Sequence, residues 1–129
     1  MRSIRSSGRA TDSRNYGVIM ATTDIESDVR SGALWITLNR PQAMNALTPS
    51  SVKGIHEALD TAQDNPDIKA VVISGTGRAF CAGADLKFIQ NEVGDDRIAI
   101  DRFLRSVLDL MLRIEGFPRP VIAAVNGLA

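Results

Sequence analysis

The sequence predicts an α/β fold in which helices pack against a parallel sheet. Residues 68–74 form a short apolar run, which is typical of a strand buried on both faces. Residues 48–64 carry apolar side chains at helical spacing, and residues 121–125 form a second short apolar run. Because the helix lies between an expected strand at residues 33–38 and the buried strand at residues 68–74, these segments indicate a strand–helix–strand crossover unit.

Composition limits the classes of partner and compartment. The chain has 129 residues, of which 44% are hydrophobic and 23% charged, as in one ordinary domain. A formal net charge of +0 and an aromatic content of 5% argue against nucleic acid and membrane surfaces as partners. The single cysteine excludes an internal disulfide and favours a reducing compartment, the cytoplasm. No apolar run approaches the length needed to span a membrane.

The first residues differ in composition from the rest. Residues 1–21 are rich in Arg and Ser and contain one acidic residue, Asp12. We expect a disordered N-terminal extension here, followed by a domain over residues 22–129. The segment lacks the apolar stretch of a secretory signal. A mitochondrial presequence stays open as an alternative, since such segments are also rich in Arg and Ser and poor in acids.

The first half of the domain carries clear local signals. Residues 25–38 read as a hairpin whose turn lies at residues 30–32. Thr48 followed by Pro49 is a helix start, because a hydroxyl side chain caps the helix and proline suits its first turn. The helix should end at residues 64–66, where Asp-Asn-Pro interrupts the pattern.

The second half adds two helices and a strand. We expect a short helix over residues 85–91, a break at residues 92–96 and the longest helix over residues 96–115. The broad apolar stripe of that helix predicts core packing. Residues 121–125 should be a buried strand, after which Asn126-Gly127 forms a turn.

A loop rich in glycine and alanine, residues 74–87, connects the buried strand to the short helix. Small side chains let backbone N–H groups approach a ligand closely, and N–H groups around Gly83 would meet an anionic oxygen at the helix start. The loop is no dinucleotide fingerprint, because Phe80 occupies the third glycine position, and no phosphate loop, because no Gly-Lys-Ser/Thr follows. An ordinary strand–loop–helix connection remains the alternative.

Three segments together resemble a known family. Residues 78–87, Arg-Ala-Phe-Cys-Ala-Gly-Ala-Asp-Leu-Lys, are similar to the first oxyanion-hole segment of the crotonase family, the enoyl-CoA hydratases and isomerases. Residues 38–47 resemble the family's early Asn-Arg-Pro…Asn-Ala-Leu loop, and residues 118–129 resemble the approach to its second oxyanion segment. The resemblance covers residues 24–129 and implies an incomplete crotonase-like ββα superhelix, the N-terminal portion of that spiral fold.

The resemblance implies a site for an acyl-CoA thioester. The backbone N–H of Ala84 would be the first oxyanion-hole donor, and Gly83 would permit the close approach. The backbone around Ala82 and the loop that contains Ala46 would contact the coenzyme A part of the substrate, and Arg40 would reach one of its phosphates. A solvated Arg40 in a turn is the open alternative. The remaining ligand-lining residues implied by the resemblance are Asp85, Leu86 and Lys87.

The sequence also departs from the family pattern. The second oxyanion donor and the catalytic glutamates of the family belong to segments that would follow Gly127, and this sequence does not contain them. We therefore expect a truncated crotonase-like domain that is inactive alone. The resemblance implies coenzyme A only as part of the substrate, no other cofactor, no metal, and homotrimers or hexamers for complete members.

Two alternatives remain open besides a truncated hydratase or isomerase. One is a non-catalytic remnant that binds acyl-CoA, or half of a split protein. The other is a ClpP-like peptidase, which is disfavoured because His56 precedes the central loop and no serine occupies a nucleophile turn. We expect His56 at the surface and Cys81 as a small structural residue instead of a nucleophile.

Overall fold

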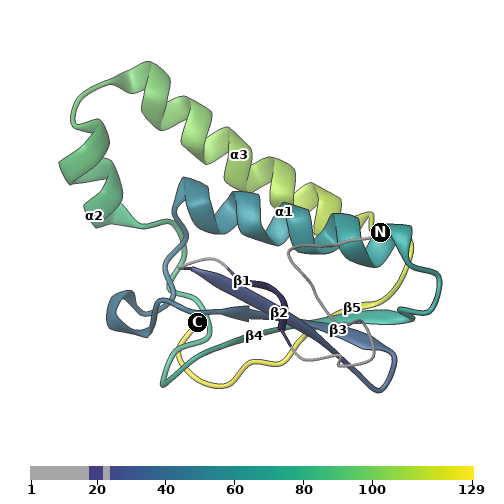
Figure 1. Ribbon diagram of the computed structural model, residues 1–129. Coiled ribbons are helices and arrows are strands. Elements are labelled where there is room, and N and C mark those ends of the chain that lie inside the picture. The colour runs from purple at the N-terminus through teal and green to yellow at the C-terminus, as the bar shows by residue number, and fades with distance from the viewer. Residues whose placement is uncertain (1–17, 22–23) are drawn as a thin grey trace.

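The computed structural model describes residues 18–21 and 24–129. These residues form one five-stranded sheet in the order β1-β2-β3-β4-β5, with the helices on one face (Figure 1). The first three strands pair antiparallel, and β3, β4 and β5 pair parallel. The strands are β1 (Val18–Ala21), β2 (Ile25–Arg30), β3 (Ala33–Leu38), β4 (Ala70–Gly75) and β5 (Val121–Ala123). The predicted α/β class with a parallel crossover is confirmed.

The hairpin between β2 and β3 closes through a two-residue turn. Arg30 pairs with Ala33, so only Ser31 and Gly32 connect the strands. Their φ angles are 49° and 82°, and two successive positive values match the twist of a tight hairpin. The hairpin expected from the sequence is therefore confirmed.

Helix α1 (Pro49–Asp64) begins and ends where its local signals predict. The Thr48 side chain accepts a hydrogen bond from Ser51 N–H, and Ser51 Oγ accepts one from Thr48 N–H, which completes a capping box. Gly54 lets the helix approach β2, since a Cβ there would lie 2.8 Å from Ile25 Cγ1. The core between α1 and the sheet includes Leu34, Ile36, Leu59, Ile68 and Val71.

Strands β4 and β5 differ in burial. Val71 to Ile73 of β4 are buried in succession, which confirms a strand covered on both faces. The strand predicted over residues 121–125 is present as β5, but it ends at Ala123, and the prediction that it is buried was wrong because Ile122 and Val125 are 51% and 59% exposed. Because β5 is the last strand of the sheet, it has only one strand beside it among the described residues.

Helix α3 (Arg97–Glu115) occupies the expected range, with Asp96 as its cap. The prediction that its whole apolar stripe packs in the core was wrong. Phe103 and Leu110 are buried, but Leu104, Leu108 and Met111 are exposed. Figure 1 shows the reason: α3 lies along α1, farther from the sheet, so only one side of its stripe meets other elements.

The connection between the central loop and α3 is more helical than expected. Helix α2 (Leu86–Phe88) continues directly into η2, a π-helical turn over Ile89–Val93. The chain therefore stays helical two residues past the predicted end at residue 91. Gly94, with a φ of 61°, ends the turn. A short 3-10 turn, η1 (Pro41–Ala43), lies in the loop after β3.

The predicted disordered segment, residues 1–21, ends in a strand instead, because β1 pairs with the outer edge of β2. The rest of that prediction lies outside the described residues. Among the described residues, no helix has the length and apolar character needed to cross a membrane.

Candidate functional site

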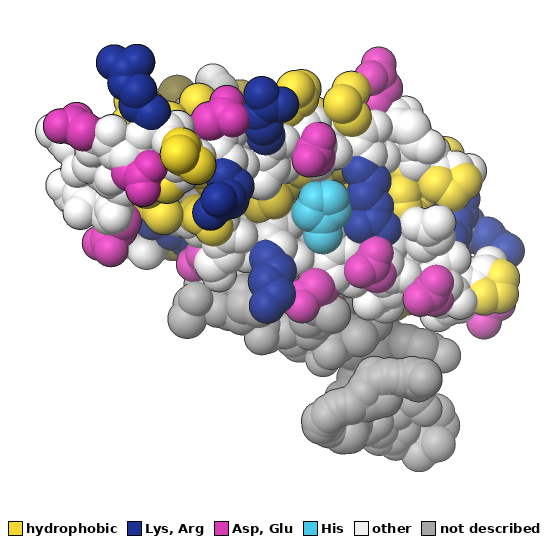
Figure 2. Space-filling model, turned by 90° about the horizontal axis from the view of Figure 1, so that it is seen from above, with side chains coloured by type: hydrophobic (Ala, Val, Ile, Leu, Met, Phe, Trp, Pro, Cys, Tyr) yellow, Lys and Arg dark blue, Asp and Glu magenta, His cyan; other side chains and the backbone are white. Residues whose placement is uncertain are grey.

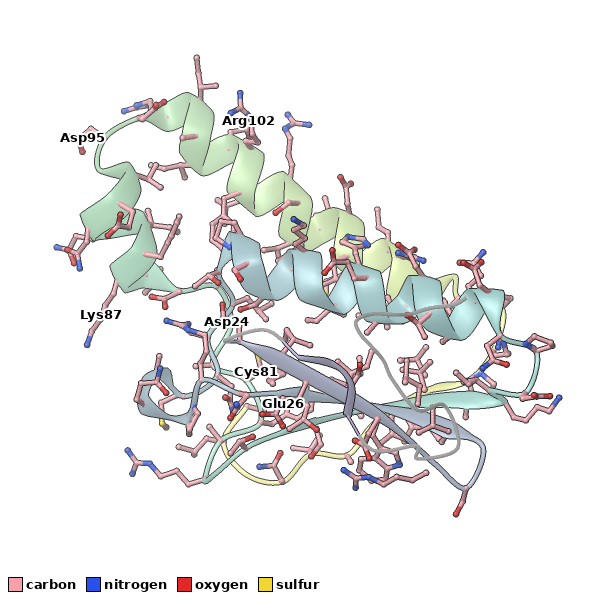
Figure 3. The ribbon with its side chains drawn as sticks, in the orientation of Figure 1. Asp24, Glu26, Cys81, Lys87, Asp95 and Arg102 are labelled. Carbon is pink, nitrogen blue, oxygen red and sulfur yellow. The ribbon has the colours of Figure 1, made fainter. Side chains whose placement is uncertain are left out.

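Two loops meet at the carboxyl ends of the parallel strands β3 and β4. The first covers residues 39–47 and the second residues 76–85. Thr76 N–H donates to Leu38 O at 2.9 Å, and a parallel bridge joins Leu47 to Ala84. Figure 3 shows Asp24, Glu26 and Cys81 at this end of the sheet. Ligands of α/β proteins commonly bind at this edge, so the loops form the candidate site.

Asn45 joins the two loops from inside. Its side chain is 1% exposed, and Nδ2 donates to Thr76 O at 3.0 Å and to Ala79 O at 2.9 Å. Oδ1 accepts from Arg40 N–H at 2.8 Å. The residue also has a φ of 56°, a conformation that asparagine adopts more readily than most residues. Asn45 therefore fixes the relative position of both loops.

Asn126 holds the same loop from the other side. Its Nδ2 donates to Gly77 O at 3.0 Å and to Ala79 O at 3.2 Å, and Oδ1 accepts from Gly75 N–H. A Cβ on Gly75 would lie only 2.5 Å from Ala79 O, so the loop closes too tightly for any side chain. Neither asparagine was predicted to brace the loop, although both lie in the motifs that carry the resemblance.

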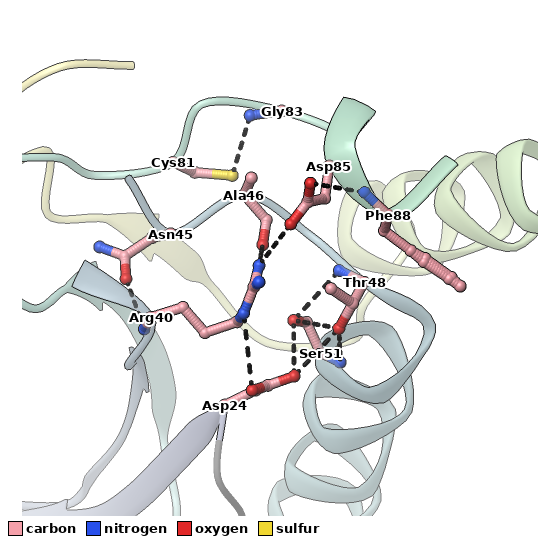
Figure 4. A network of polar contacts seen from close by, with 10 residues as sticks. All are labelled: Asp24, Arg40, Asn45, Ala46, Thr48, Ser51, Cys81, Gly83, Asp85 and Phe88. Atoms are coloured by element: carbon pink, nitrogen blue, oxygen red, sulfur yellow. Dashed lines mark hydrogen bonds and ion pairs between the residues drawn. The ribbon is translucent and has the colours of Figure 1, made fainter. Parts of the chain in front are cut away.

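A network of charged residues lies under the site (Figure 4). Arg40 Nη1 donates to Asp85 Oδ2 at 2.9 Å and to Ala46 O at 2.6 Å, and Nε lies 3.7 Å from Asp24 Oδ1. Asp85 caps α2, because its Oδ1 accepts from Phe88 N–H at 3.0 Å. The Arg40 and Asp85 side chains are 19% and 8% exposed. Both side chains therefore brace the loops from within.

The balance of forces on Asp85 favours its charged form. Burial raises the pKa of this carboxyl, but hydrogen bonds from Phe88 N–H and Arg40, with the charge of Arg40, outweigh burial and lower the pKa. Because the folded pKa lies below the unfolded one, the carboxylate stabilises the fold above the unfolded value, about 4. This contribution is lost as the pH falls through the folded pKa.

Asp85→Asn tests this balance, because asparagine retains the capping oxygen and removes the charge. We expect the free energy of unfolding at pH 7 to fall by about 2 kcal/mol, since Arg40 keeps some solvent contact. In urea titrations at decreasing pH, the difference from wild type should shrink as the pH falls through the folded pKa of Asp85. The control is Asp101→Asn, which breaks the exposed Arg105–Asp101 pair and should change little. Equal effects of the two substitutions would contradict the assignment.

The backbone N–H groups at residues 82–85 differ in what they contact. Ala82 N–H donates to Met44 O at 3.0 Å, Gly83 N–H to Cys81 Sγ at 3.4 Å and Asp85 N–H to Leu47 O at 2.9 Å. Within the described residues, the N–H of Ala84 has no acceptor. The bridge to Leu47 explains this, because successive N–H groups of an extended segment point in opposite directions.

The other residues predicted to contact the ligand differ in how exposed they are. Ala82 and Gly83 are exposed, and Gly83 has a φ of 102°, which other residues rarely adopt. Leu86 is 75% exposed, and Lys87 is also exposed and extends outward from α2 (Figure 3). Ala46 is buried, and its carbonyl is the acceptor for Arg40.

Cys81 and His56 take no part in a catalytic pair in the described structure. Cys81 is partly buried and packs against the core, and its sulfur accepts the Gly83 N–H. His56 is less exposed than expected, because Arg113 of α3 donates to its Nδ1 at 3.0 Å. This partner lies on another helix, far along the chain from the central loop, so the site offers no support for the peptidase alternative.

Comparisons with known proteins agree with the fold and the loops. The sequence model of the family described as enoyl-CoA hydratase/isomerase matches residues 33–129. A probable enoyl-CoA hydratase of Mycobacterium tuberculosis is 43% identical over 94 residues, which are 73% of this chain and 36% of the relative. A putative enoyl-CoA hydratase/isomerase of Bacillus subtilis is 43% identical over 101 residues, or 73% and 35% of the two chains.

Solved structures show the same partial overlap. An enoyl-CoA hydratase/isomerase from Xanthobacter autotrophicus superposes with a TM-score of 0.78 and 36% identity, covering 83% of this chain and 40% of that one. For an enoyl-CoA hydratase from Bacillus anthracis the TM-score is 0.75, with 30% identity and coverage of 82% and 41%. The chain thus has part of the crotonase fold and spans less than half the length of these relatives. Because the family model matches most of its residues, the chain belongs to the enoyl-CoA hydratase/isomerase family.

Proposed function

We propose that this chain forms the part of an acyl-CoA site that contains the first oxyanion-hole donor, the backbone N–H of Ala84. The observation that carries the proposal is that this N–H alone, among those of residues 82–85, has no acceptor in the described structure. When an acyl-CoA thioester forms an enolate, negative charge develops on its oxygen. A fixed N–H aimed at that oxygen stabilises the transition state by about 3 kcal/mol.

The surrounding residues divide into those that contact the ligand and those that hold the loop. Exposed Ala82 and Gly83 leave the backbone open to the pantetheine part of the substrate, and Leu86 and Lys87 flank it. Arg40 Nη1 donates to two internal acceptors, and its guanidinium also forms an ion pair with Asp24. We therefore give Arg40 and Asp85 a positioning role in place of the direct ligand contact expected from the sequence. Ala46 contributes through the carbonyl that anchors Arg40.

The reaction proposed for the complete protein is addition of water to a 2-enoyl-CoA, or a shift of its double bond. The relatives named as enoyl-CoA hydratases support this proposal. Coenzyme A enters as part of the substrate, and no other cofactor is proposed. Glutamates would act as general acid and base. They and the second N–H donor would come from polypeptide that this sequence does not contain.

An exposed apolar face supports the need for further polypeptide. It has two parts: Leu104, Leu108, Met111 and Leu112 on α3, and Ile122, Val125 and Leu128 on β5 and the residues after it. These side chains are each 44–59% exposed, and groups of exposed apolar side chains commonly mark an interaction surface. We propose that the missing part of the fold covers this face, either in the same chain or as a separately encoded half.

The test is a pair of measurements on the chain as it stands. We expect crotonyl-CoA to bind in a calorimetric titration, and we expect no hydration of crotonyl-CoA by the same sample. A full-length hydratase serves as the positive control for the assay. Turnover by the purified chain would contradict the proposed division of the site, and absence of binding would contradict the acyl-CoA proposal. Co-purification of a second, catalytic piece would favour the split protein over a non-catalytic remnant.

Assembly and compartment stay predictions. Trimers or hexamers are expected only for complete members of the family. The cytoplasm is the expected compartment because the chain has one cysteine, and a mitochondrial location is the alternative.

A further inference from the structure

A second cavity lies away from the Ala84 loop, on the helical face of the molecule. It has a volume of about 560 Å³ and opens between α1, the α2–η2 segment and α3. Its apolar lining includes Val52, Phe88, Val93 and Phe103, and the Phe88 and Phe103 ring centroids are 5.6 Å apart. No residue of the segment 82–87 lines it. A cavity of this size can enclose most of a small organic molecule.

The rim of this cavity carries an excess of positive charge. Lys53 of α1 and Arg102 of α3 both line it, from different helices. Within the described part of the chain, neither side chain has an ion-pair or hydrogen-bond partner, whereas Arg105 and Arg113 of α3 are both paired with carboxylates. His56 and the acidic Asp109 also line the cavity, so its basic residues outnumber its acidic one.

Figure 2 shows this face directly. Apolar side chains are exposed on it, and basic side chains, acidic side chains and the histidine lie around them. An apolar cavity with two unpaired cations at its mouth fits a ligand that has an apolar body and one anionic end. Arginine pairs well with carboxylates in a two-pronged geometry, and lysine adds a second point charge.

We propose that this cavity binds a small amphipathic carboxylate of the fatty-acid type. The aliphatic chain would lie against Val52, Val93 and the two phenylalanine rings. The carboxylate would lie at the rim between Lys53 and Arg102. This site is separate from the thioester site, and it does not depend on the function proposed for the Ala84 loop.

The experiment is a titration of the full chain with decanoate, followed by the methyl resonances of its valine, leucine and isoleucine residues in carbon–proton NMR spectra. Decan-1-ol is the matched probe, since it has the same aliphatic chain without the charge. We expect decanoate to shift the Val52 and Val93 methyl resonances saturably. Decanol should bind more weakly, because it leaves both cations without a partner.

Two variants test separately the contribution of the apolar cavity and the contribution of the two basic side chains at its rim. Ala99→Phe fills the cavity from α3 and should abolish the shifts at Val52 and Val93. Lys53→Gln combined with Arg102→Gln should weaken decanoate binding about tenfold, the size expected for two partly exposed ion pairs. Arg97→Gln is the control: it removes a cation from the start of α3, outside the cavity, and should leave the affinity unchanged.

The opposite results would overturn the proposal. If decanol and decanoate bind equally well and the double charge substitution has no effect, then the carboxylate does not contribute to binding and the proposed ligand class is wrong. Shifts confined to Leu104, Leu108 and Ile122 would show association with the exposed apolar face instead of the cavity. The charge variant keeps the test decisive if Ala99→Phe does not fold, because Lys53 and Arg102 are surface residues.

Discussion

Removing the N–H of Ala84 should lower kcat about a hundredfold in a complete enzyme that contains this segment. The protein for this test is a chimera in which residues 33–129 replace the matching segment of the Mycobacterium tuberculosis relative. Ala84→Pro deletes the one N–H in residues 82–85 that has no internal acceptor, so it should cost transition-state stabilisation and little internal hydrogen bonding. Crotonyl-CoA hydration rates measure the loss.

The control keeps the N–H and changes the side chain. Ala84→Gly should retain kcat within a few-fold, because the proposed interaction uses only the backbone. Melting temperatures of both variants show whether the loop still folds. If Ala84→Pro folds and keeps its activity, this N–H is not the oxyanion donor. If Ala84→Gly loses as much activity as Ala84→Pro, the effect comes from the side chain.

Replacing Asn45 with alanine should lower the free energy of unfolding by about 3 kcal/mol. The substitution removes both side-chain donors to the central loop, to Thr76 O and Ala79 O, and leaves Arg40 N–H without its acceptor. Alanine also tolerates the φ of 56° less well than asparagine does. Urea denaturation at neutral pH measures the change.

Asn91→Ala is the matched control, because Asn91 lies exposed in η2 and the described structure gives its side chain no hydrogen bond. It should change the stability by less than about 0.5 kcal/mol. A small effect of Asn45→Ala, comparable with that of the control, would show that the two loops keep their arrangement without the asparagine.

Local signals explain what the sequence predicted well. The ends of α1 follow from Thr48, Pro49 and the Asp-Asn-Pro at residues 64–66, and each of these acts within a few residues. The hairpin turn at Ser31 and Gly32 is equally local. Both features depend on backbone conformations that neighbouring residues determine, so a single sequence is enough to place them.

Burial was less predictable because it depends on what covers an element. The apolar patterns of α3 and β5 indicate faces that can be buried, but they do not say whether this chain supplies the cover. Leu108 and Ile122 belong to apolar patterns that predict core positions, but both side chains are exposed. The sequence identified the right side chains and overestimated how many of them this chain encloses.

The site residues were predicted only through the resemblance, and the structure adds long-range contacts that the sequence did not indicate. The prediction that Arg40 meets a substrate phosphate could not anticipate its pairing with Asp85, which lies 45 residues further along the chain. The same holds for the side chain of Asn126, which donates hydrogen bonds to the carbonyl oxygens of Gly77 and Ala79 in the central loop. Such contacts depend on the tertiary fold, and no local spacing encodes them.

The most direct test of the central claim is a titration of the nitrogen-15-labelled chain with crotonyl-CoA, followed at the amide of Ala84. We predict a downfield shift of the Ala84 amide proton that saturates with ligand and exceeds the shifts of Ala82 and Gly83, whose N–H groups already have acceptors. Free coenzyme A, which lacks the thioester, should not produce it. An Ala84 amide that stays unchanged at saturation, or that responds equally to free coenzyme A, would contradict the assignment of this N–H to the thioester oxygen.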